Sequence, residues 1–352
     1  MSDKPDRETM IGWLAETDSA RLETLYREAY QLKLSTVGSK VYFRGIIEFS
    51  NLCAKDCYYC GIRRSNRNVR RYVMDYDDAL SAAMWAHARG YGSIVFQTGE
   101  RTDSEFIETV DRFLRDVREK TKNGLGITLS LGEQEESVYR RWFELGAHRY
   151  LLRIETSSPA LYAKLHPSDH SWEKRLSCIR ALKNIGYQAG TGVMIGLPGQ
   201  TLENLADDIL FFESEGIDMI GMGPYVPHHD TPLAKVFPEG REALERNFQL
   251  GLTMIALTRL RIPDVNIAST TALQAIDPVG REKGLKAGAN ILMPVITPRK
   301  YRADYLLYDG KPCIEDEADD CRRCLEGRVR LSGETVGWGE RGDSPHYRAP
   351  GR

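Results

Sequence analysis

Residues 46–61 read Ile-Ile-Glu-Phe-Ser-Asn-Leu-Cys-Ala-Lys-Asp-Cys-Tyr-Tyr-Cys-Gly. The apolar start of this stretch predicts a β-strand, and the strand leads directly into a loop that carries three cysteines. Cys53, Cys57 and Cys60 follow the spacing CxxxCxxC, and the aromatic Tyr59 precedes the last of them. Three thiols placed so closely after a strand predict a set of metal ligands.

The number of these cysteines distinguishes between metal centres. Three thiolates on a 4Fe–4S cluster leave one iron free to chelate S-adenosylmethionine (SAM) and to pass an electron into its sulfonium, which gives methionine and a 5′-deoxyadenosyl radical. Ferredoxin-type carriers instead supply four cysteines per cluster. Structural zinc and free core thiols are the alternatives, but zinc sites usually close with a fourth Cys or His, and the sequence has no His near this loop. The spacing resembles that of the radical SAM superfamily.

The composition excludes several other classes of protein. The net charge of −2 gives no indication of nucleic-acid binding, which usually requires a basic patch. The charged N-terminus lacks the apolar core of a signal peptide, and no run reaches the ~18 apolar residues that a membrane helix requires. Six of the seven cysteines fall into two clusters, which predicts metal ligands in a reducing, anaerobic cytoplasm rather than disulfides.

Short β-branched runs alternate with amphipathic segments along the chain, which is typical of a parallel βα architecture. We predict an α/β fold with a full (βα)8 TIM-type barrel, whose functional residues lie at the C-terminal ends of the strands. The N-terminal helical segment comprises residues 1–36, with two helices outside the barrel. The barrel follows at 37–310, and an accessory cysteine segment with a loosely ordered tail at 311–352. The predicted strands span residues 41–49, 93–97, 126–131, 149–154, 188–195, 219–223, 266–271 and 290–294.

Polar residues end the second and third predicted strands. The second ends in Gly99-Glu100, where glycine allows a backbone to approach a ligand closely. A similar Gly-Glu turn meets the SAM amino group in radical SAM enzymes, although a simple strand-to-helix turn is the alternative. Thr128 and Ser130 on the third strand point to one side, because side chains alternate along a strand.

Arg153 and Glu155 end the fourth predicted strand with the same alternate spacing, so both side chains point to one face. In a barrel this face can point into the cavity, where the planar guanidinium of Arg153 suits a carboxylate ligand. A buried ion pair that only stabilises the barrel is the alternative.

Two further loops contain residue types that can bind a ligand or a metal ion. Residues 192–201 read Gly-Val-Met-Ile-Gly-Leu-Pro-Gly-Gln-Thr, in which the glycines permit tight turns beside a ligand and Thr201 can cap the next helix. This run is not a nucleotide P-loop, because it lacks the Gly-Lys-Ser/Thr ending. Residues 228–230 are His-His-Asp, but the flanking prolines and the lack of further spaced ligands favour a rigid loop over a metal site.

The last two predicted strands precede Thr270 and Thr271, and then Tyr305 and Tyr308. The threonine hydroxyls either face a substrate or bond to the local backbone. Tyrosines at helical spacing usually pack, but at this position they can close the cavity.

A second set of cysteines, Cys313, Cys321 and Cys324, lies in an acidic run near the C-terminus. A CxxC pair with one upstream cysteine is good metal-ligand spacing, so we expect an accessory 2Fe–2S cluster or zinc. A partly occupied or vestigial site is the alternative. Cys178 lies on a predicted helix and is expected to be a buried core thiol.

Nearly the whole chain resembles the HydE family of FeFe-hydrogenase maturation enzymes. Val295 and Gln274 depart from the family pattern, which has Asn and Gly there. The matching runs are IIEFSNLC (46–53), LSLGE (129–133), RYLLRIET (149–156), MIGLPGQT (194–201) and GANILMP (288–294).

The resemblance implies site residues and a reaction. It implies SAM contacts at Glu155 and Arg175. The implied substrate is a cysteine-bound Fe(CO)2(CN) complex made by a partner maturase, whose iron unit goes toward the diiron subcluster of the hydrogenase. Other maturases and a reducing electron donor are the implied partners. The substrate cavity is expected to contain Thr128, Ser130, Arg153, Thr270, Thr271, Tyr305 and Tyr308.

Two other functions share these sequence features. A methylornithine synthase-like amino-acid mutase would use the same barrel and cluster motif, and biotin synthase is a more distant relative. A non-catalytic iron–sulfur carrier would bind clusters but not SAM.

Overall fold

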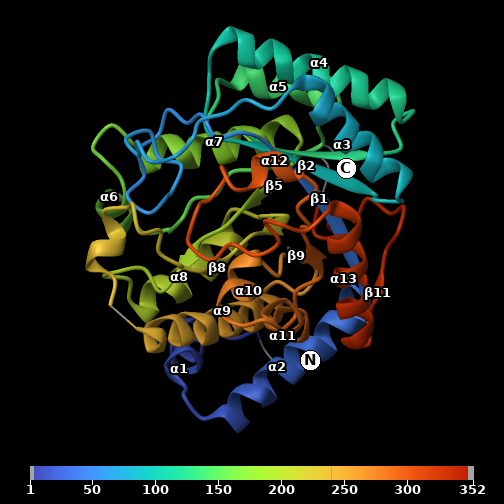
Figure 1. The fold of residues 1–352 in the computed structure, drawn as a ribbon. Helices are drawn as coiled ribbons and strands as arrows, with labels where there is room; N and C mark the ends of the chain where they lie inside the picture. The colour runs from blue at the N-terminus through green and yellow to red at the C-terminus, as the bar shows by residue number, and fades with distance from the viewer. Residues whose placement is uncertain (1–3, 239, 348–352) are drawn as a thin grey trace.

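A computed structural model describes residues 4–238 and 240–347 (Figure 1). The chain begins with α1 (Arg7–Ala15) and α2 (Ser19–Thr36). The Asp6 and Asp18 carboxylates cap these helices by accepting backbone N–H groups of their first turns. Helix α1 packs on α8 (Leu202–Ser214) and α2 packs on α9 (Arg241–Arg261), so both lie outside the sheet.

Eight parallel strands form the central sheet, in the order β10-β1-β2-β3-β4-β5-β7-β9. A parallel bridge between Ala268 and Ile291 joins the two ends of this order, and the N–H of Ser269 donates to the carbonyl of Ile291 at 2.9 Å. The strands therefore form a closed ring, and the predicted βα barrel is confirmed. They are β1 (Lys40–Ser50), β2 (Ser93–Thr98), β3 (Gly126–Ser130), β4 (Arg149–Leu151), β5 (Gln188–Thr191), β7 (Met219–Ile220), β9 (Asn266–Ile267) and β10 (Ile291–Leu292).

Helices cover the outside of the ring and give it a second apolar layer, as parallel strands require. Thr201 caps α8 in a capping box with Asn204, as predicted, and Cys178 is buried within α7. No helix among the described residues is long and apolar enough to cross a membrane. The helices after β1 are α3 (Tyr76–Ala88), α4 (Ser104–Lys120), α5 (Glu136–Glu144), α6 (Pro159–Leu165), α7 (Trp172–Ile185), α8 (Leu202–Ser214), η1 (Leu233–Val236), α9 (Arg241–Arg261), α10 (Thr271–Ile276), α11 (Gly280–Lys286), α12 (Arg299–Arg302) and α13 (Ala318–Leu331).

Two predicted strands, 188–195 and 219–223, are each divided between the ring and a second sheet. The stretch 188–195 contains β5 and then β6 (Met194–Ile195), which pairs with β8 (Gly223–Pro224) in a separate two-stranded sheet. The break follows from close packing at Gly192, where a Cβ atom would lie 2.0 Å from the carbonyl oxygen of Gly221. Only glycine permits such a close approach of two backbones. The alternation of apolar and polar residues in the sequence does not indicate where the strand is broken.

The prediction of a loosely ordered tail is wrong for its described residues, which end at 347. Strand β11 (Thr335–Val336) pairs with β1 beside α13 (Figure 1). The following residues cover the N-terminal end of the barrel. There Arg149 donates to Asp343 at 2.6 Å, and Arg44 and Asn266 both donate to the carbonyl of Gly342. The polar residues of the tail thus find partners inside the barrel, which its Gly- and Arg-rich composition does not indicate.

Candidate active site

A cavity of about 360 Å³ opens at the C-terminal end of the barrel strands, where βα barrels place their functional groups. Residues that follow each of the eight ring strands contribute to its wall. Every site residue that the sequence predicts on the barrel lines it, except Thr128. These are Cys53, Cys57, Tyr59, Cys60, Gly99, Glu100, Ser130, Arg153, Glu155, Arg175, Thr270, Thr271, Tyr305 and Tyr308.

Thr128 lies one layer deeper than Ser130 on the same face of β3. It is fully buried beside Arg149 in the neighbouring strand, and its Oγ1 has no hydrogen-bond partner among the described residues. The alternation of β3 assigns the correct face to Thr128, but it does not show how deep the cavity reaches.

The cysteine loop is fixed against the second strand. A Cβ atom on Gly99 would lie 2.3 Å from the carbonyl oxygen of Leu52, so glycine is required for this contact with the cysteine loop. The backbone N–H of Glu100 then donates to Cys53 Sγ at 3.3 Å. Burial raises the pKa of all three thiols, that of Cys57 to about 12, so metal binding must displace their protons.

The three thiols do not stand as close together as the ligands of a single metal ion. Ligands of a tetrahedral zinc, with Zn–S bonds near 2.3 Å, place their sulfurs about 3.8 Å apart. Within the described ranges, the group that brings three possible ligand atoms within 4.8 Å of one another is His228–Asp230, and neither cysteine set is as compact.

Tyr59 is held in place by a histidine that the sequence analysis missed. His166 Nδ1 is 2.9 Å from the carbonyl of Tyr162 and must donate to it, so the free lone pair lies on Nε2. The Tyr59 hydroxyl, 3.1 Å away, therefore donates to Nε2. Burial lowers the pKa of His166 to about 3, which keeps the ring neutral.

Four charged side chains form a network beside the cysteines. Arg175 Nε donates to Glu133 at 2.6 Å, and Lys55 Nζ donates to the other oxygen of Glu133 at 2.9 Å. Glu100 lies 3.3 Å from Lys55 and 3.7 Å from Arg175. Burial opposes ionisation, but the paired charges prevail: the pKa of Glu133 is lowered and that of Arg175 is raised. Lys55 and Glu133 do not belong to a recognisable spacing of ligands or catalytic residues in the sequence, so no role was predicted for either.

Arg153 and Glu155 do form the ion pair that their spacing suggests, with Arg153 Nε 3.1 Å from both carboxylate oxygens. Arg153 also donates to the carbonyl of Gly221 at 2.7 Å. Glu155 adopts a left-handed backbone conformation with φ of +68°, which is costly for a residue other than glycine. The structure thus holds this carboxylate at the cavity by a strained turn at the end of β4.

The opposite wall carries hydroxyl groups and a second buried pair. The Tyr305 hydroxyl accepts a hydrogen bond from Gln97 at 3.1 Å, while the buried Thr270 Oγ1 has no partner among the described residues. Lys311 Nζ donates to Glu48 at 2.5 Å and to the carbonyl of Tyr305 at 2.9 Å. Glu48 and Lys311 both line the cavity. Because they lie far apart in the sequence, the ion pair between them could not be predicted.

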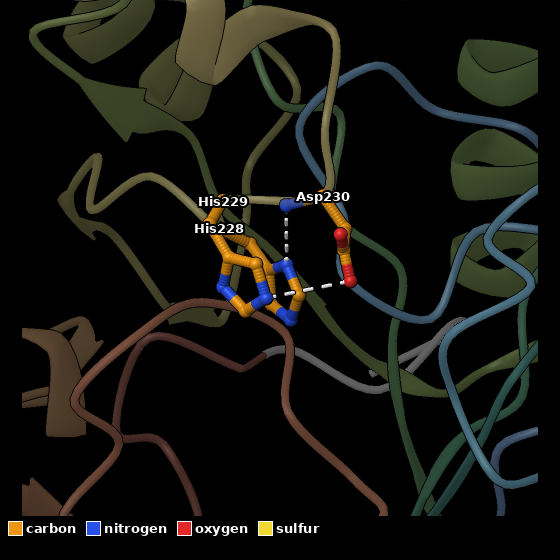
Figure 2. A group of neighbouring side chains, drawn as sticks. All are labelled: His228, His229 and Asp230. Carbon is orange, nitrogen blue, oxygen red and sulfur yellow. Dashed lines mark hydrogen bonds and ion pairs between the residues drawn. The ribbon is translucent and has the colours of Figure 1, made fainter.

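The His-His-Asp stretch forms an internally bonded loop (Figure 2). The backbone N–H of Asp230 is 3.2 Å from His228 Nδ1, and Asp230 Oδ2 is 3.4 Å from His229 Nε2. Asp309 accepts hydrogen bonds from the His229 ring and backbone, at 2.8 and 2.9 Å. The buried His228 ring packs against Gly61, next to Cys60, where a Cβ atom would lie 2.3 Å from it. These contacts fit the rigid-loop interpretation.

The second cysteine set lies outside the cavity. Cys321 and Cys324 are one turn apart on α13, and Cys313 precedes the helix in a left-handed conformation with φ of +64°. A hydrogen bond between Cys313 and the buried Cys321 lowers the pKa of Cys313 to about 7 and raises that of Cys321, so the two thiols are in direct contact.

A βα barrel with three cysteines on its first loop, beside buried charges at the C-terminal mouth, is the architecture of a radical SAM enzyme. The sequence profile of the Radical SAM superfamily matches residues 47–212. The FeFe-hydrogenase maturase subunit HydE of Thermotoga maritima is 44% identical over 337 residues, which cover 95% of this chain and 93% of that protein. The biotin synthase of Porphyromonas gingivalis is 26% identical over 85% of this chain and 86% of that enzyme.

A solved structure has a fold similar to this barrel. The crystal structure of methylornithine synthase aligns with a TM-score of 0.81 at 22% identity, over 96% of each chain. This chain belongs to the HydE family of radical SAM enzymes, which use a 4Fe–4S cluster and SAM.

Proposed function

We propose that this enzyme acts in FeFe-hydrogenase maturation on a cysteine-bound Fe(CO)2(CN) complex, with Cys53, Cys57 and Cys60 as the cluster ligands. One observation carries the proposal: the three cysteines share a single cavity with Arg153 and the unpartnered Thr270 hydroxyl. When bound, the cluster supplies the electron that splits SAM to the 5′-deoxyadenosyl radical. The similarity to the Thermotoga maritima maturase supports the choice of substrate.

The protein contributes binding and orientation. Arg175 and Glu155 are the proposed SAM contacts, because a guanidinium suits the SAM carboxylate and a carboxylate suits its ribose hydroxyls. Arg153, Thr270 and Thr271 would hold an anionic substrate through one positive charge and hydroxyl donors. Ser130, Tyr305 and Tyr308 complete a wall that excludes water from the reacting atoms.

The charges of the cavity favour this substrate over a free amino acid. A lysine mutase needs a carboxylate for the distal amine of its substrate. Each carboxylate that lines the cavity is already paired: Glu48 with Lys311, Glu100 with Lys55 and Arg175, and Glu155 with Arg153. A fifth cation in this cavity would therefore have to break an existing ion pair.

We further propose that other hydrogenase maturases supply the substrate and receive the product, and that a low-potential donor reduces the cluster. An accessory 2Fe–2S cluster or zinc at Cys313, Cys321 and Cys324 completes the proposed cofactor set.

The decisive assay adds the anaerobically reconstituted enzyme, SAM, reductant and the iron complex to an apo-hydrogenase that requires maturation. We expect hydrogenase activity together with 5′-deoxyadenosine. A parallel reaction with lysine tests the mutase. Formation of methylornithine from lysine, or no maturation with the iron complex present, would contradict the proposal.

A further inference from the structure

A second hollow, of about 400 Å³, lies on the outer side of the cysteine loop, and we call it the outer hollow. It is enclosed by residues 52–54, residues 100–103, Arg64 and Arg71. Cys53 and Glu100 line both the outer hollow and the substrate cavity, so these two residues form the wall between them. At Cys53, one layer of protein therefore separates the proposed cluster from the outer surface.

The other two cysteines of the loop are covered on their outer side and do not line the outer hollow. The residue after Cys57 donates its backbone N–H to the carbonyl of Leu165 on α6 at 2.9 Å. The residue after Cys60 donates its N–H to the carbonyl of Leu307, also at 2.9 Å. Electron tunnelling weakens steeply with distance, and SAM would occupy the inner side of the loop. An electron from outside the protein therefore has its most direct entry at Cys53.

The arginines of the outer hollow carry charge that no close carboxylate neutralises. Residues 63–71 contain five arginines and no acid, in a chain whose net charge is −2. Arg64 has 57% of its side chain exposed, and its ion-pair partner Asp169 is 3.9 Å away and 60% exposed, so this pair is weak. Arg71 donates to four backbone carbonyls of the loop, at Asn51, Ile62, Arg63 and Asn66, and to no carboxylate among the described residues.

The remaining charges of the outer hollow already have partners. Arg101 donates to Asp103 through two nitrogens, at 2.8 and 2.9 Å. Glu100 lies 3.3 Å from Lys55 and 3.7 Å from Arg175, so its charge is taken up on the cavity side. The outer hollow is therefore left with an excess of positive charge.

The rest of the arginine run adds to this excess. Arg63 and Arg70 are paired with Asp56 and Asp304. Arg67 is exposed and has no ion pair in the part of the chain that the structure describes. A positive surface around a thin wall suits a partner whose own surface is acidic.

We propose that the outer hollow is the docking site of an acidic electron-carrier protein, which reduces the cluster through Cys53. Acidic side chains of the carrier would meet Arg64 and Arg71 and turn its redox centre toward the cysteine loop. The centre of the carrier loses one electron and the cluster gains it, so no bond breaks and no proton moves. The inference rests on the proposed function, and it names the surface on which the electron donor of that function binds.

The test supplies electrons to the full-length reconstituted enzyme in two ways. Dithionite is too small to require a docking surface, whereas a bacterial flavodoxin in its hydroquinone form is an acidic protein carrier. Arg64→Glu reverses the charge of the outer hollow, and Arg64→Gln removes it. Arg27→Glu is the matched control, because Arg27 is an exposed arginine on α2, where it donates to Thr24 and has no ion pair among the described residues. The readouts are the Kd of flavodoxin and the rate of 5′-deoxyadenosine formation, each at low and at high salt.

We expect Arg64→Glu to weaken flavodoxin binding, and to slow the flavodoxin-driven reaction, roughly fivefold or more at low salt. Arg64→Gln should fall between, and Arg27→Glu should match the wild type. The differences should disappear at high salt, because exposed charges are screened. With dithionite all four proteins should react at the same rate. If Arg64→Glu does not fold, the comparison of Arg64→Gln with Arg27→Glu decides.

Wild-type affinity and rate in both Arg64 variants would overturn the inference. An equal loss in Arg27→Glu, an equal loss with dithionite, or a wild-type enzyme that flavodoxin neither binds nor reduces would overturn it too. The proposed function is scored by the wild type with dithionite alone. Product with dithionite alongside a negative Arg64 result contradicts only the docking site, and no product with dithionite contradicts the function whatever flavodoxin binding shows.

Discussion

The two ends of the barrel both contain arginines, but the charges of these arginines have different partners. At the C-terminal mouth, Arg153 and Arg175 are paired with carboxylates around a cavity of about 360 Å³. At the N-terminal mouth, Arg44 and Arg149 donate to the tail at Gly342 and Asp343. One set of charges surrounds space for a ligand, while the other is covered by the protein's own chain.

This difference separates function from stability, as is usual in βα barrels. Changes at the C-terminal mouth should alter ligand binding and chemistry while the barrel stays folded. Changes at the N-terminal mouth should reduce stability and leave the chemistry intact.

The largest effect is expected for Arg153→Met. Loss of the guanidinium should abolish maturation of an apo-hydrogenase, because the substrate loses its one positive contact, while SAM cleavage without substrate continues. Hydrogenase activity and 5′-deoxyadenosine are measured side by side, with Arg153→Lys as the control for charge. Full maturation activity in Arg153→Met would place the substrate contact elsewhere in the cavity.

Arg175→Met should weaken SAM binding by roughly 10–150-fold, the equivalent of losing a charge-assisted hydrogen bond of about 1.5–3 kcal/mol. Equilibrium binding to the reconstituted enzyme measures this effect. Because Glu133 loses one of its two partners and keeps only Lys55, the melting temperature must be recorded too, and Arg175→Lys keeps the network charged. Unchanged SAM affinity in a folded Arg175→Met variant would remove this role.

Asp343→Asn tests the opposite mouth. Burial opposes ionisation of Asp343, but its contact with His148 and the charge of Arg149 lower its pKa well below the ordinary value. Its stabilisation is therefore complete above about pH 4 and declines gradually below it, until the pH reaches the much lower pKa of the folded state. The variant should lose about 1–2 kcal/mol at pH 7, discounted because Asp343 is half-exposed.

Urea unfolding of wild type and Asp343→Asn at pH 7 and pH 3 measures this effect. The difference in stability between the two proteins should be smaller at pH 3 than at pH 7, and 5′-deoxyadenosine formation at pH 7 should be equal. A loss of SAM cleavage in a folded Asp343→Asn protein would break the separation between the two ends.

The smallest effect is expected for the exposed pair of His229 and Asp309. The hydrogen bond to Asp309 raises the pKa of His229, so its stabilisation is complete below about pH 6.5 and is lost as the pH rises through the higher folded value. His229→Gln should cost at most ~0.5 kcal/mol at pH 6, as expected for an exposed pair, and less at pH 9. Asp309→Asn should reproduce this pH dependence; a constant difference from pH 6 to 9 would exclude the pair as its cause.

The sequence predicted the parts of this molecule that depend on local pattern. Strand alternation assigned Arg153 and Glu155 to one face, and the three-cysteine spacing located the C-terminal mouth. Residues brought together by the barrel's closure were not predicted. The pair Glu48–Lys311 spans 263 residues of sequence, and Tyr59 meets His166 only because α6 folds back over the cysteine loop.

The C-terminal tail shows a second limit. Its Gly- and Arg-rich composition predicted loose structure, because such a segment has few apolar side chains to bury by itself. Asp343 instead meets Arg149 and Gln188 inside the base of the barrel. A segment whose partners are buried charges on other strands cannot be identified from its own residues.

The central claim is that Cys53, Cys57 and Cys60, and not the accessory cysteines, support radical formation. It is tested by anaerobic reconstitution of two triple alanine variants, one for each cysteine set, followed by reduction with SAM and measurement of 5′-deoxyadenosine. We predict no product above background from the Cys53/Cys57/Cys60 variant and product from the Cys313/Cys321/Cys324 variant. Product from the first variant, or none from the second when it is folded, would contradict the claim.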